Sequence, residues 1–259
     1  MKSIWLLVLF LPFVVKAQTK WDITSFGAGY YFQPIELNGL DYESFYNSFD
    51  RSASLPSLDS FKSLNTKIEL RQIGWSFGFA FQLKNEEKSI NRHSFLLEFR
   101  NGTIGNNEFN AGDNTFFTLQ SIRNQQTTYL LTTKNEVFGI GLGYNYLWLS
   151  KGRFNSSIGA VFNFDNQVSK KMRVRNESDI NPIDTNFNGN GPYVIEHNYF
   201  LTKTPSWYLQ PRASFSFRIA KQATLNYQFA FGLASYGLEG KSIYGTARTN
   251  TIGLKYNLL

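Results

Sequence analysis

Long stretches of this sequence alternate, residue by residue, between a large apolar side chain and a small or polar one. In the clearest stretch, 72–83, Ile73, Trp75 and Phe77 begin one face, and Gln72 and Gly74 begin the other. A period of two is the pattern of a β-strand, because successive side chains point to opposite faces. The same alternation recurs, clearly or more weakly, in the segments 22–32, 93–103, 138–148, 153–165, 207–219, 224–233 and 246–258. We therefore predict eight strands, each close to the ~9–11 residues with which a tilted strand crosses a bilayer.

The chemistry of the two faces distinguishes a soluble sheet from a membrane-embedded one. The apolar faces consist mainly of large aromatics: the chain has 25 Phe and 14 Tyr, although its mean hydropathy is −0.29. The polar faces carry Gly, Ser, Gln and Arg rather than the Lys, Glu and Thr of a solvated exterior. A soluble β-sandwich or a lipocalin-like barrel also has alternating strands, but aromatic exteriors around polar interiors are typical of transmembrane barrels. We predict an all-β, transmembrane, antiparallel up-and-down β-barrel of about eight strands.

The connections between the predicted strands alternate in length. Those at 33–66, 104–127 and 166–204 are long, those at 84–91, 150–152 and 220–222 are short, and that at 237–245 is intermediate. Outer-membrane barrels have short periplasmic turns and longer outer loops, so this order predicts both chain ends in the periplasm. The segment 113–133 would give an odd count of nine if it crossed the membrane. We predict instead that it is outer loop plus an extension of the fourth strand; a barrel of ten strands would need a partner strand that the pattern does not supply.

The first 17 residues have the form of a cleaved secretory signal peptide. Lys2 supplies the positive charge, the apolar run 4–15 is too short to span a bilayer, and Ala17 is the small residue before the expected cleavage. An uncleaved anchor is the alternative, and the short apolar run disfavours it. The chain has no cysteine to carry a lipid. We expect a mature chain, 18–259, that forms a single outer-membrane β-barrel domain.

The charge of the chain gives only general information about its partners. Removal of 1–17 takes away two of 26 basic residues and leaves 24 against 19 acidic residues, a net charge of +5. The single basic run is Lys170, Lys171, Arg173 and Arg175. Nucleic-acid-binding proteins concentrate their basic residues in a patch or stripe, so we expect no nucleic-acid partner. Attraction to an anionic surface such as lipopolysaccharide is the more natural expectation.

The interior of an eight-stranded barrel is just wide enough for side chains to fill. The charged residues that the alternation directs inward are Glu98, Arg100, Arg212, Arg218 and Lys255. The uncharged polar residues on the same faces are Gln72, Gln82, Asn145, Asn163, Gln210, Asn226 and Gln228. Because buried charges must be paired and hydrogen-bonded, we predict that these residues form a polar network that closes the lumen. A narrow ion or proton path is the alternative.

The positions of the acids within the barrel can also be predicted. Counting from the strand ends places Glu98 and Arg212 at comparable heights, close enough for their long side chains to meet. Asp165 falls near the outer rim of its strand. Glu98 is therefore expected to be the only acid deep in the lumen.

The residues offer little support for catalysis, and we predict no catalytic residues, no cofactor and no enzyme activity. Lipid-modifying barrel enzymes need a nucleophile, a base and an orienting group within reach of one another. The two histidines do not supply that set: His93 and Ser94 are neighbours on a strand and point to opposite faces, and His197 lies in a loop without an evident partner.

A metal site has one candidate. Asp184, Asn186 and Asn188 resemble the first half of a calcium-binding loop. The twelfth position of that pattern requires glutamate and is occupied here by Ile195, with Glu196 one residue late. We therefore expect no bound metal.

The first long connection contains an aromatic motif. Tyr42, Phe45, Tyr46 and Phe49 follow the spacing i, i+3, i+4, i+7 of a short amphipathic helix. We expect this helix to cover the barrel mouth or another loop. Binding of a protein partner is the alternative, since aromatic residues often anchor interfaces.

Several segments together resemble small outer-membrane β-barrel proteins of the OmpA/OmpX type from Gram-negative bacteria. They are the signal peptide, the strand FGIGLGYNYLWL, the turn SKG, the strand RFNSSIGAVFNF and the terminal IGLKYNLL. The resemblance covers the whole mature chain and concerns patterns rather than fixed residues. It implies a location in the cell outer membrane and insertion by the barrel assembly machinery, although Leu259 stands where such chains usually end on an aromatic. The chain stops at the last strand, so no OmpA-like peptidoglycan-binding domain is expected.

We expect a structural or surface-interactive protein that displays three long loops outside the cell. One alternative is an accessory subunit of an outer-membrane secretion or uptake complex, which would carry a contiguous apolar patch on its loops. The other is a lipid-modifying barrel enzyme, which would carry a polar cluster near the outer leaflet.

Overall fold

The computed structural model describes most of the chain, namely residues 21–47, 55–64, 68–83, 92–104, 114–123, 127–178 and 193–258. The predicted signal peptide, 1–17, lies outside the described residues. So do Phe49 of the aromatic motif and the candidate metal residues Asp184, Asn186 and Asn188.

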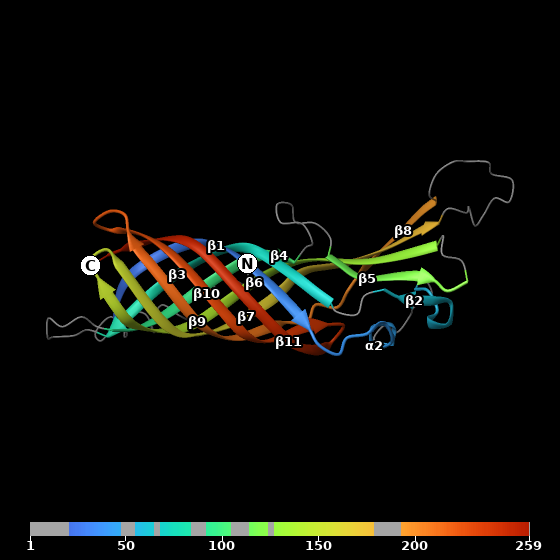
Figure 1. Cartoon of the computed structure of the whole chain (residues 1–259), viewed down its shortest axis with the longest axis horizontal. Helices are drawn as coiled ribbons and strands as arrows, with labels where there is room; N and C mark the ends of the chain where they lie inside the picture. The colour runs from blue at the N-terminus through green and yellow to red at the C-terminus, as the bar shows by residue number, and fades with distance from the viewer. Residues whose placement is uncertain are drawn as a thin grey trace, which may run out of the picture.

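Within these residues, eight antiparallel strands pair in a closed ring, as predicted (Figure 1). In ring order they are β1 (Trp21–Leu37), β3 (Ile68–Leu83), β4 (His93–Ile104), β6 (Thr127–Lys151), β7 (Phe154–Ser178), β9 (Ser206–Arg218), β10 (Ala223–Leu238) and β11 (Lys241–Asn257). The ring closes where β1 pairs with β11, for example Ala28 with Leu254. The predicted all-β, up-and-down barrel is confirmed.

Three short strands lie outside the ring. They are β2 (Phe61–Ser63), β5 (Asn114–Ser121) and β8 (Tyr193–Phe200). In β6, residues 135–146 pair with β4 and residues 128–133 pair with β5. In β7, residues 154–165 pair with β9 and residues 171–178 pair with β8. The segment 113–133 thus contributes an extension of the fourth ring strand, as predicted, but the part predicted to be outer loop forms the strand β5.

Several strands continue well past the predicted limits. β6 and β7 have 25 residues each, more than twice the ~9–11 that cross a bilayer. More than half of the predicted connection 166–204 is therefore strand, whereas in the predicted connection 33–66 only the first residues, up to Leu37, and the short strand β2 are. The predicted connection 237–245 is too long. β10 and β11 pair as far as Leu238 and Lys241, so the connection is a two-residue turn of Glu239 and Gly240, both with positive φ. In Figure 1 the extended wall with β2, β5 and β8 forms the right-hand end, here called the outer extension.

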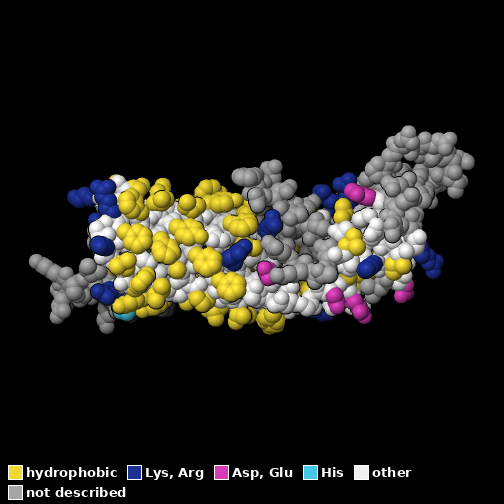
Figure 2. Space-filling model, viewed as in Figure 1, with side chains coloured by type: hydrophobic (Ala, Val, Ile, Leu, Met, Phe, Trp, Pro, Cys, Tyr) yellow, Lys and Arg dark blue, Asp and Glu magenta, His cyan; other side chains and the backbone are white. Residues whose placement is uncertain are grey.

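The outward faces of the ring strands form an apolar belt. Exposed large side chains occur on every ring strand, among them Phe26, Phe77, Phe95, Leu142, Phe162, Phe217, Leu225 and Ile252. On the face seen in Figure 2, hydrophobic side chains cover the left part of the barrel, and charged and polar groups lie at both ends of this area. A soluble monomer rarely exposes an apolar surface of this extent, so the belt identifies the part of the wall that faces lipid.

The outer extension has a largely apolar interior, which was not predicted. Its buried side chains include Ile35, Leu37, Leu70, Ile104, Leu119, Leu131, Met172 and Val174. The short helix α2 (Tyr42–Tyr46) and the 3₁₀ turn η1 (Leu58–Ser60) lie at this end of the barrel. No helix among the described residues is long and apolar enough to span a membrane. Burial of these side chains holds together a wall that projects beyond the lipid-facing belt.

Candidate functional site

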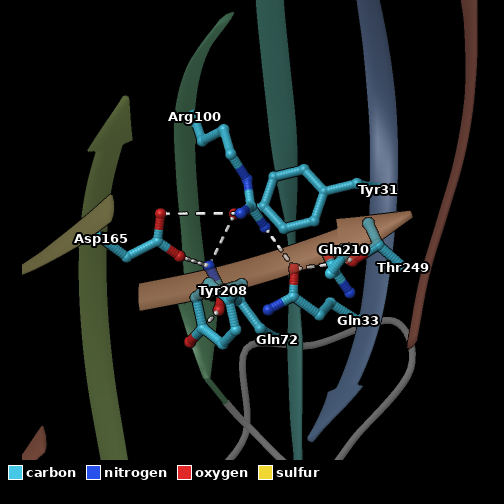
Figure 3. Close-up of polar contacts among 8 residues, drawn as sticks. All are labelled: Tyr31, Gln33, Gln72, Arg100, Asp165, Tyr208, Gln210 and Thr249. Carbon is cyan, nitrogen blue, oxygen red and sulfur yellow. Dashed lines mark hydrogen bonds and ion pairs between the residues drawn. The ribbon is translucent and has the colours of Figure 1, made fainter. Parts of the chain in front are cut away.

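A cluster of buried polar side chains fills the middle of the barrel (Figure 3). It comprises Tyr31, Gln33, Gln72, Arg100, Asp165, Tyr208, Gln210 and Thr249, which we call the central polar cluster. The residues come from six different ring strands: β1, β3, β4, β7, β9 and β11. Each residue belongs to the inward face of its strand. Because alternate side chains point inward, those of the six strands meet near the barrel axis.

Arg100 and Asp165 form the charged centre of this cluster. Arg100 Nη1 lies 3.7 Å from Asp165 Oδ1, and the two side chains are only 3% and 0% exposed. Arg100 Nη2 donates a hydrogen bond of 2.7 Å to Gln33 Oε1, and the guanidinium carbon lies 4.3 Å from the centre of the Tyr31 ring. Figure 3 shows the guanidinium between the carboxylate on one side and Tyr31 and Gln33 on the other. Such packing fixes both partners of a charge pair that is removed from water.

Gln72 connects the carboxylate to two tyrosines. Its Nε2 donates to Asp165 Oδ2 at 2.7 Å and lies 3.0 Å from Tyr31 Oη. Its Oε1 accepts from the Tyr208 hydroxyl at 3.3 Å. The amide therefore uses both its donor and its acceptor groups, and it joins β1, β3, β7 and β9 across the lumen.

A second set of contacts crosses the other side of the lumen. Thr249 Oγ1 lies 2.9 Å from Gln33 Oε1 and 3.0 Å from Gln210 Oε1, and its single proton is donated to one of them. Gln210 Nε2 donates to the Ala247 carbonyl at 2.9 Å. With these bonds the cluster closes the section of the barrel between β1, β9 and β11.

Glu98 and Arg212 form a separate layer next to the central polar cluster. Arg212 Nη1 donates to Glu98 Oε1 at 2.7 Å and to Gln228 Oε1 at 3.1 Å, and Nη2 lies 3.3 Å from Asn145 Oδ1. The structure thus brings together the two residues that the sequence placed at comparable heights. The Glu98 side chain is 17% exposed, because it also lines a wide space toward the short turns.

Glycines on the inward face of β6 make room for both layers. A side chain at Gly139 would overlap Asp165 Oδ1, and one at Gly141 would overlap Asn163 Oδ1. A Cβ at Gly143 would come within 2.6 Å of Arg212 Nη2. The repeated glycines of FGIGLGYN therefore act through their size, since polar groups from neighbouring strands occupy the space above them.

The position of Asp165 corrects the sequence analysis. Asp165 is not near an exposed rim but fully buried, so Glu98 is not the only acid deep in the lumen. The predicted inward residues also did not include Tyr31, Gln33 and Thr249. Tyr31 and Thr249 lie on the inward faces of the predicted segments 22–32 and 246–258, and Gln33 continues the same phase one residue past the first of them.

Arg218 and Lys255 do not join either layer. Both line a polar space of about 890 Å³, here called the vestibule, at the end of the barrel that carries the turns 150–152 and 220–222. Between the Glu98–Arg212 layer and the central polar cluster lies a separate cavity of only about 20 Å³. This volume is roughly what one water molecule occupies. The interior is therefore wide at one end and filled in the middle.

The aromatic motif forms part of the outer extension's interior. α2 begins after Asp41, whose carboxylate caps the helix by accepting from the Ser44 amide at 2.7 Å, and hydrogen bonds from Ser44 hold the pKa of Asp41 below its usual value. Tyr42 and Phe45 are buried, Tyr46 is half-buried, and Tyr42 donates to the Pro56 carbonyl at 3.0 Å. Most of the motif's described aromatic surface is used within the chain.

The histidines lie apart from each other. His93 Nδ1 lies 2.6 Å from Tyr144 Oη on the lipid-facing side of the wall, and His197 is exposed on β8. Among the described residues, no group of three His, Asp or Glu side chains is arranged to hold a metal ion.

Comparison with known proteins identifies similar folds. No family model and no curated protein matches the chain. Among solved structures, the attachment invasion locus protein Ail of Yersinia pestis is 10% identical, with 91% of this chain and 97% of that chain covered and a TM-score of 0.39. The outer membrane protein OprG from Pseudomonas aeruginosa is 9% identical, with 91% and 96% covered and a TM-score of 0.41. Neisserial surface protein A is 10% identical, with 90% and 97% covered and a TM-score of 0.37.

These similarities are too remote to transfer an activity or a ligand to this chain. The similar structures are those of small outer-membrane β-barrel proteins, the class that the sequence resembles. The fold and the membrane-facing belt of this chain follow from its own strand pairing and exposed aromatics.

Proposed function

We propose that the chain is an integral protein of the outer membrane whose closed barrel holds the outer extension at the cell surface for contact with other molecules. The observation that carries this proposal is the combination of a filled barrel interior with a wall that continues past the lipid-facing belt and has its own apolar core. A closed interior is suited to anchoring rather than to transport, and a rigid extension is suited to presenting a surface.

The partners that we propose are the lipids around the belt, including lipopolysaccharide, and a protein or glycan at the outer extension. Insertion would require the barrel assembly machinery, as for other barrels of this architecture. Phe200 on β8 supports a contact role for the extension, because it is 84% exposed and Lys171 Nζ lies 5.5 Å from its ring centre. An exposed aromatic beside a cation is a common component of interfaces. The proposed role does not involve catalysis.

The orientation can be tested with single cysteines, because the chain has none of its own. Lys203 is exposed beside β8 in the outer extension, and Lys221 is exposed in the short turn between β9 and β10. We expect a membrane-impermeant maleimide to label Lys203→Cys on intact cells and to label Lys221→Cys only after the outer membrane is opened. Labelling of Lys221→Cys alone on intact cells would show that the barrel is inserted the other way.

The closed interior predicts the electrical behaviour of the purified protein. The space between the two polar layers is about 20 Å³, and Arg100 and Asp165 occupy the axis beyond it. We therefore expect no stable conductance when the protein is inserted into planar lipid bilayers. Steady, ion-selective channels from a homogeneous preparation would contradict a filled lumen and would favour a transport role.

A further inference from the structure

The vestibule has the properties of a binding site rather than of a simple opening. It encloses about 890 Å³ and ends at the Glu98–Arg212 layer, so it is open toward the short turns and closed toward the outer extension. Much of its wall consists of hydroxyl and amide side chains, among them Ser94, Asn145, Ser157, Ser216, Asn226 and Gln228. These groups can donate hydrogen bonds to a polar ligand from several directions.

The charge of the vestibule is strongly one-sided. Arg92, Arg218, Lys221 and Lys255 all line it, whereas Glu98 is the only acid among its described lining residues and is already paired with Arg212. In the part of the chain that the structure describes, none of these four cations forms an ion pair. Cations gathered around a cavity without matching acids raise the local concentration of anions.

Two of the cations, Lys255 and Arg218, lie on either side of Thr224 on the wall of the vestibule. Thr224 on β10 pairs with Lys255 on β11 and with Arg218 on β9, so the three residues form one cross-strand row. Neighbouring strands lie about 4.8 Å apart, which separates the Lys255 and Arg218 backbones by roughly 10 Å. Their side chains are long enough to contact one ligand placed over the Thr224 hydroxyl.

The same wall contains two buried hydroxyl groups without a partner among the described residues. Ser25 on β1 and Ser214 on β9 are 1% and 4% exposed, and the described part of the chain offers neither Oγ a hydrogen-bond partner. Both residues line the vestibule. A buried polar group without a partner is unfavourable, and a ligand or a bound water that accepts its proton would relieve that cost.

We propose that the vestibule binds a small, soluble, phosphorylated molecule that enters from the short-turn end. A multiply charged phosphate suits the four cations, because guanidinium and ammonium groups bind its oxygens with strong charge-assisted hydrogen bonds. The serine, threonine and asparagine side chains suit the hydroxyl groups that such molecules often carry. This binding goes beyond the proposed surface role, and it places a second function on the opposite, periplasmic side of the barrel.

The test uses the full mature chain, refolded in a neutral detergent, with inorganic pyrophosphate as the probe and titration calorimetry as the readout. We expect saturable binding that weakens as salt is added. The variant Lys255→Gln/Arg218→Gln should weaken it by at least about tenfold, since two charge-assisted hydrogen bonds to the phosphate oxygens are lost. The matched control is Lys241→Gln/Arg248→Gln, which removes the same charge from exposed positions on β11 toward its outer end and should bind as the parent does.

Three results would overturn the proposal. They are the absence of saturable binding, an equal loss of affinity in the control variant, and binding of short-chain phosphatidic acid without binding of pyrophosphate. The last would mean that the phosphate belongs to a membrane lipid. If the double variant does not fold, a rise in the unfolding temperature of the parent chain with added pyrophosphate, and a smaller rise in Lys255→Gln alone, provide the same decision. None of these measurements depends on the orientation in the membrane, so the surface role and the vestibule can fail separately.

Discussion

Replacement of Asp165 by asparagine is expected to destabilise the barrel by about 3–5 kcal/mol, the usual effect of removing one partner of a buried ion pair. Asparagine keeps the shape of the side chain and can still accept from Gln72, so the change isolates the charge. At 3.7 Å the contact with Arg100 is too long for a hydrogen bond, so it is held mainly by charge attraction in a site closed to water. Arg100 cannot release its proton and would be left as a buried, uncompensated cation.

The measurement is the temperature at which the folded protein converts to the slower, unfolded band in a gel-shift assay. Glu98→Gln removes an acid from the neighbouring layer, but Glu98 is 17% exposed and lines the vestibule, so water can partly replace its contact with Arg212. We expect a smaller fall in the unfolding temperature for Glu98→Gln than for Asp165→Asn. Glu136→Gln, at an exposed position on β6, is the control and should change it little. The reverse order of Asp165 and Glu98 would mean that the central polar cluster is not the stabilising centre of the lumen.

The sequence was sufficient to predict the barrel because each ring strand repeats one simple constraint. A wall between lipid and a polar interior needs an apolar side chain at every second position, and a phase error of one residue would exchange the two faces. Phe138 to Trp148 of β6 and Trp207 to Phe217 of β9 keep this phase without interruption. The pattern therefore locates the strands and identifies the residues that point inward.

The heights of the inward residues could not be predicted equally well, because they depend on the stagger between strands rather than on any one strand. A strand that is ended at the edge of its aromatic run has Asp165 as its last residue. In the structure β7 continues to Ser178, and the register sets Asp165 opposite Gly139 of β6. Its carboxylate then reaches Arg100 and Gln72, which come from strands whose mutual register the sequence does not state.

Apart from the extension of the fourth strand, the outer extension was not predicted, for a related reason. Beyond the belt, apolar side chains appear at inward positions: Val137 and Leu131 on β6, with the polar Asn135 and Thr133 between them, and Met172 and Val174 on β7. The alternation there is weak, because the outward face is no longer lipid-facing and carries Thr132, Lys134 and Arg173. A search for apolar outward faces cannot detect a wall whose apolar side has moved to the interior.

The contact between Gly139 and Asp165 allows the central polar cluster to be tested with a substitution, Gly139→Ala, that changes no charged residue. In the register of β6 and β7 these two residues lie opposite each other, and the Asp165 carboxylate occupies the space where a Cβ at Gly139 would lie. The Phe164 carbonyl oxygen, at 3.0 Å from the same point, closes that space from the backbone side. A methyl group at residue 139 must therefore displace the carboxylate.

Gly139→Ala is accordingly expected to destabilise the barrel by about 1–3 kcal/mol through overpacking, and by more where the carboxylate is moved away from Arg100. In an Asp165→Ala background the carboxylate is absent, and only the tight but smaller contact with the Phe164 carbonyl oxygen remains. We therefore expect Gly139→Ala to have little further effect there, so that the double variant unfolds at nearly the same temperature as Asp165→Ala. Neighbouring residues that share one contact show this kind of coupling, whereas independent sites add to within about 0.5 kcal/mol. Additive losses in the gel-shift assay would show that Gly139 serves the backbone alone, and that the inward glycines of β6 do not provide the space for the central polar cluster.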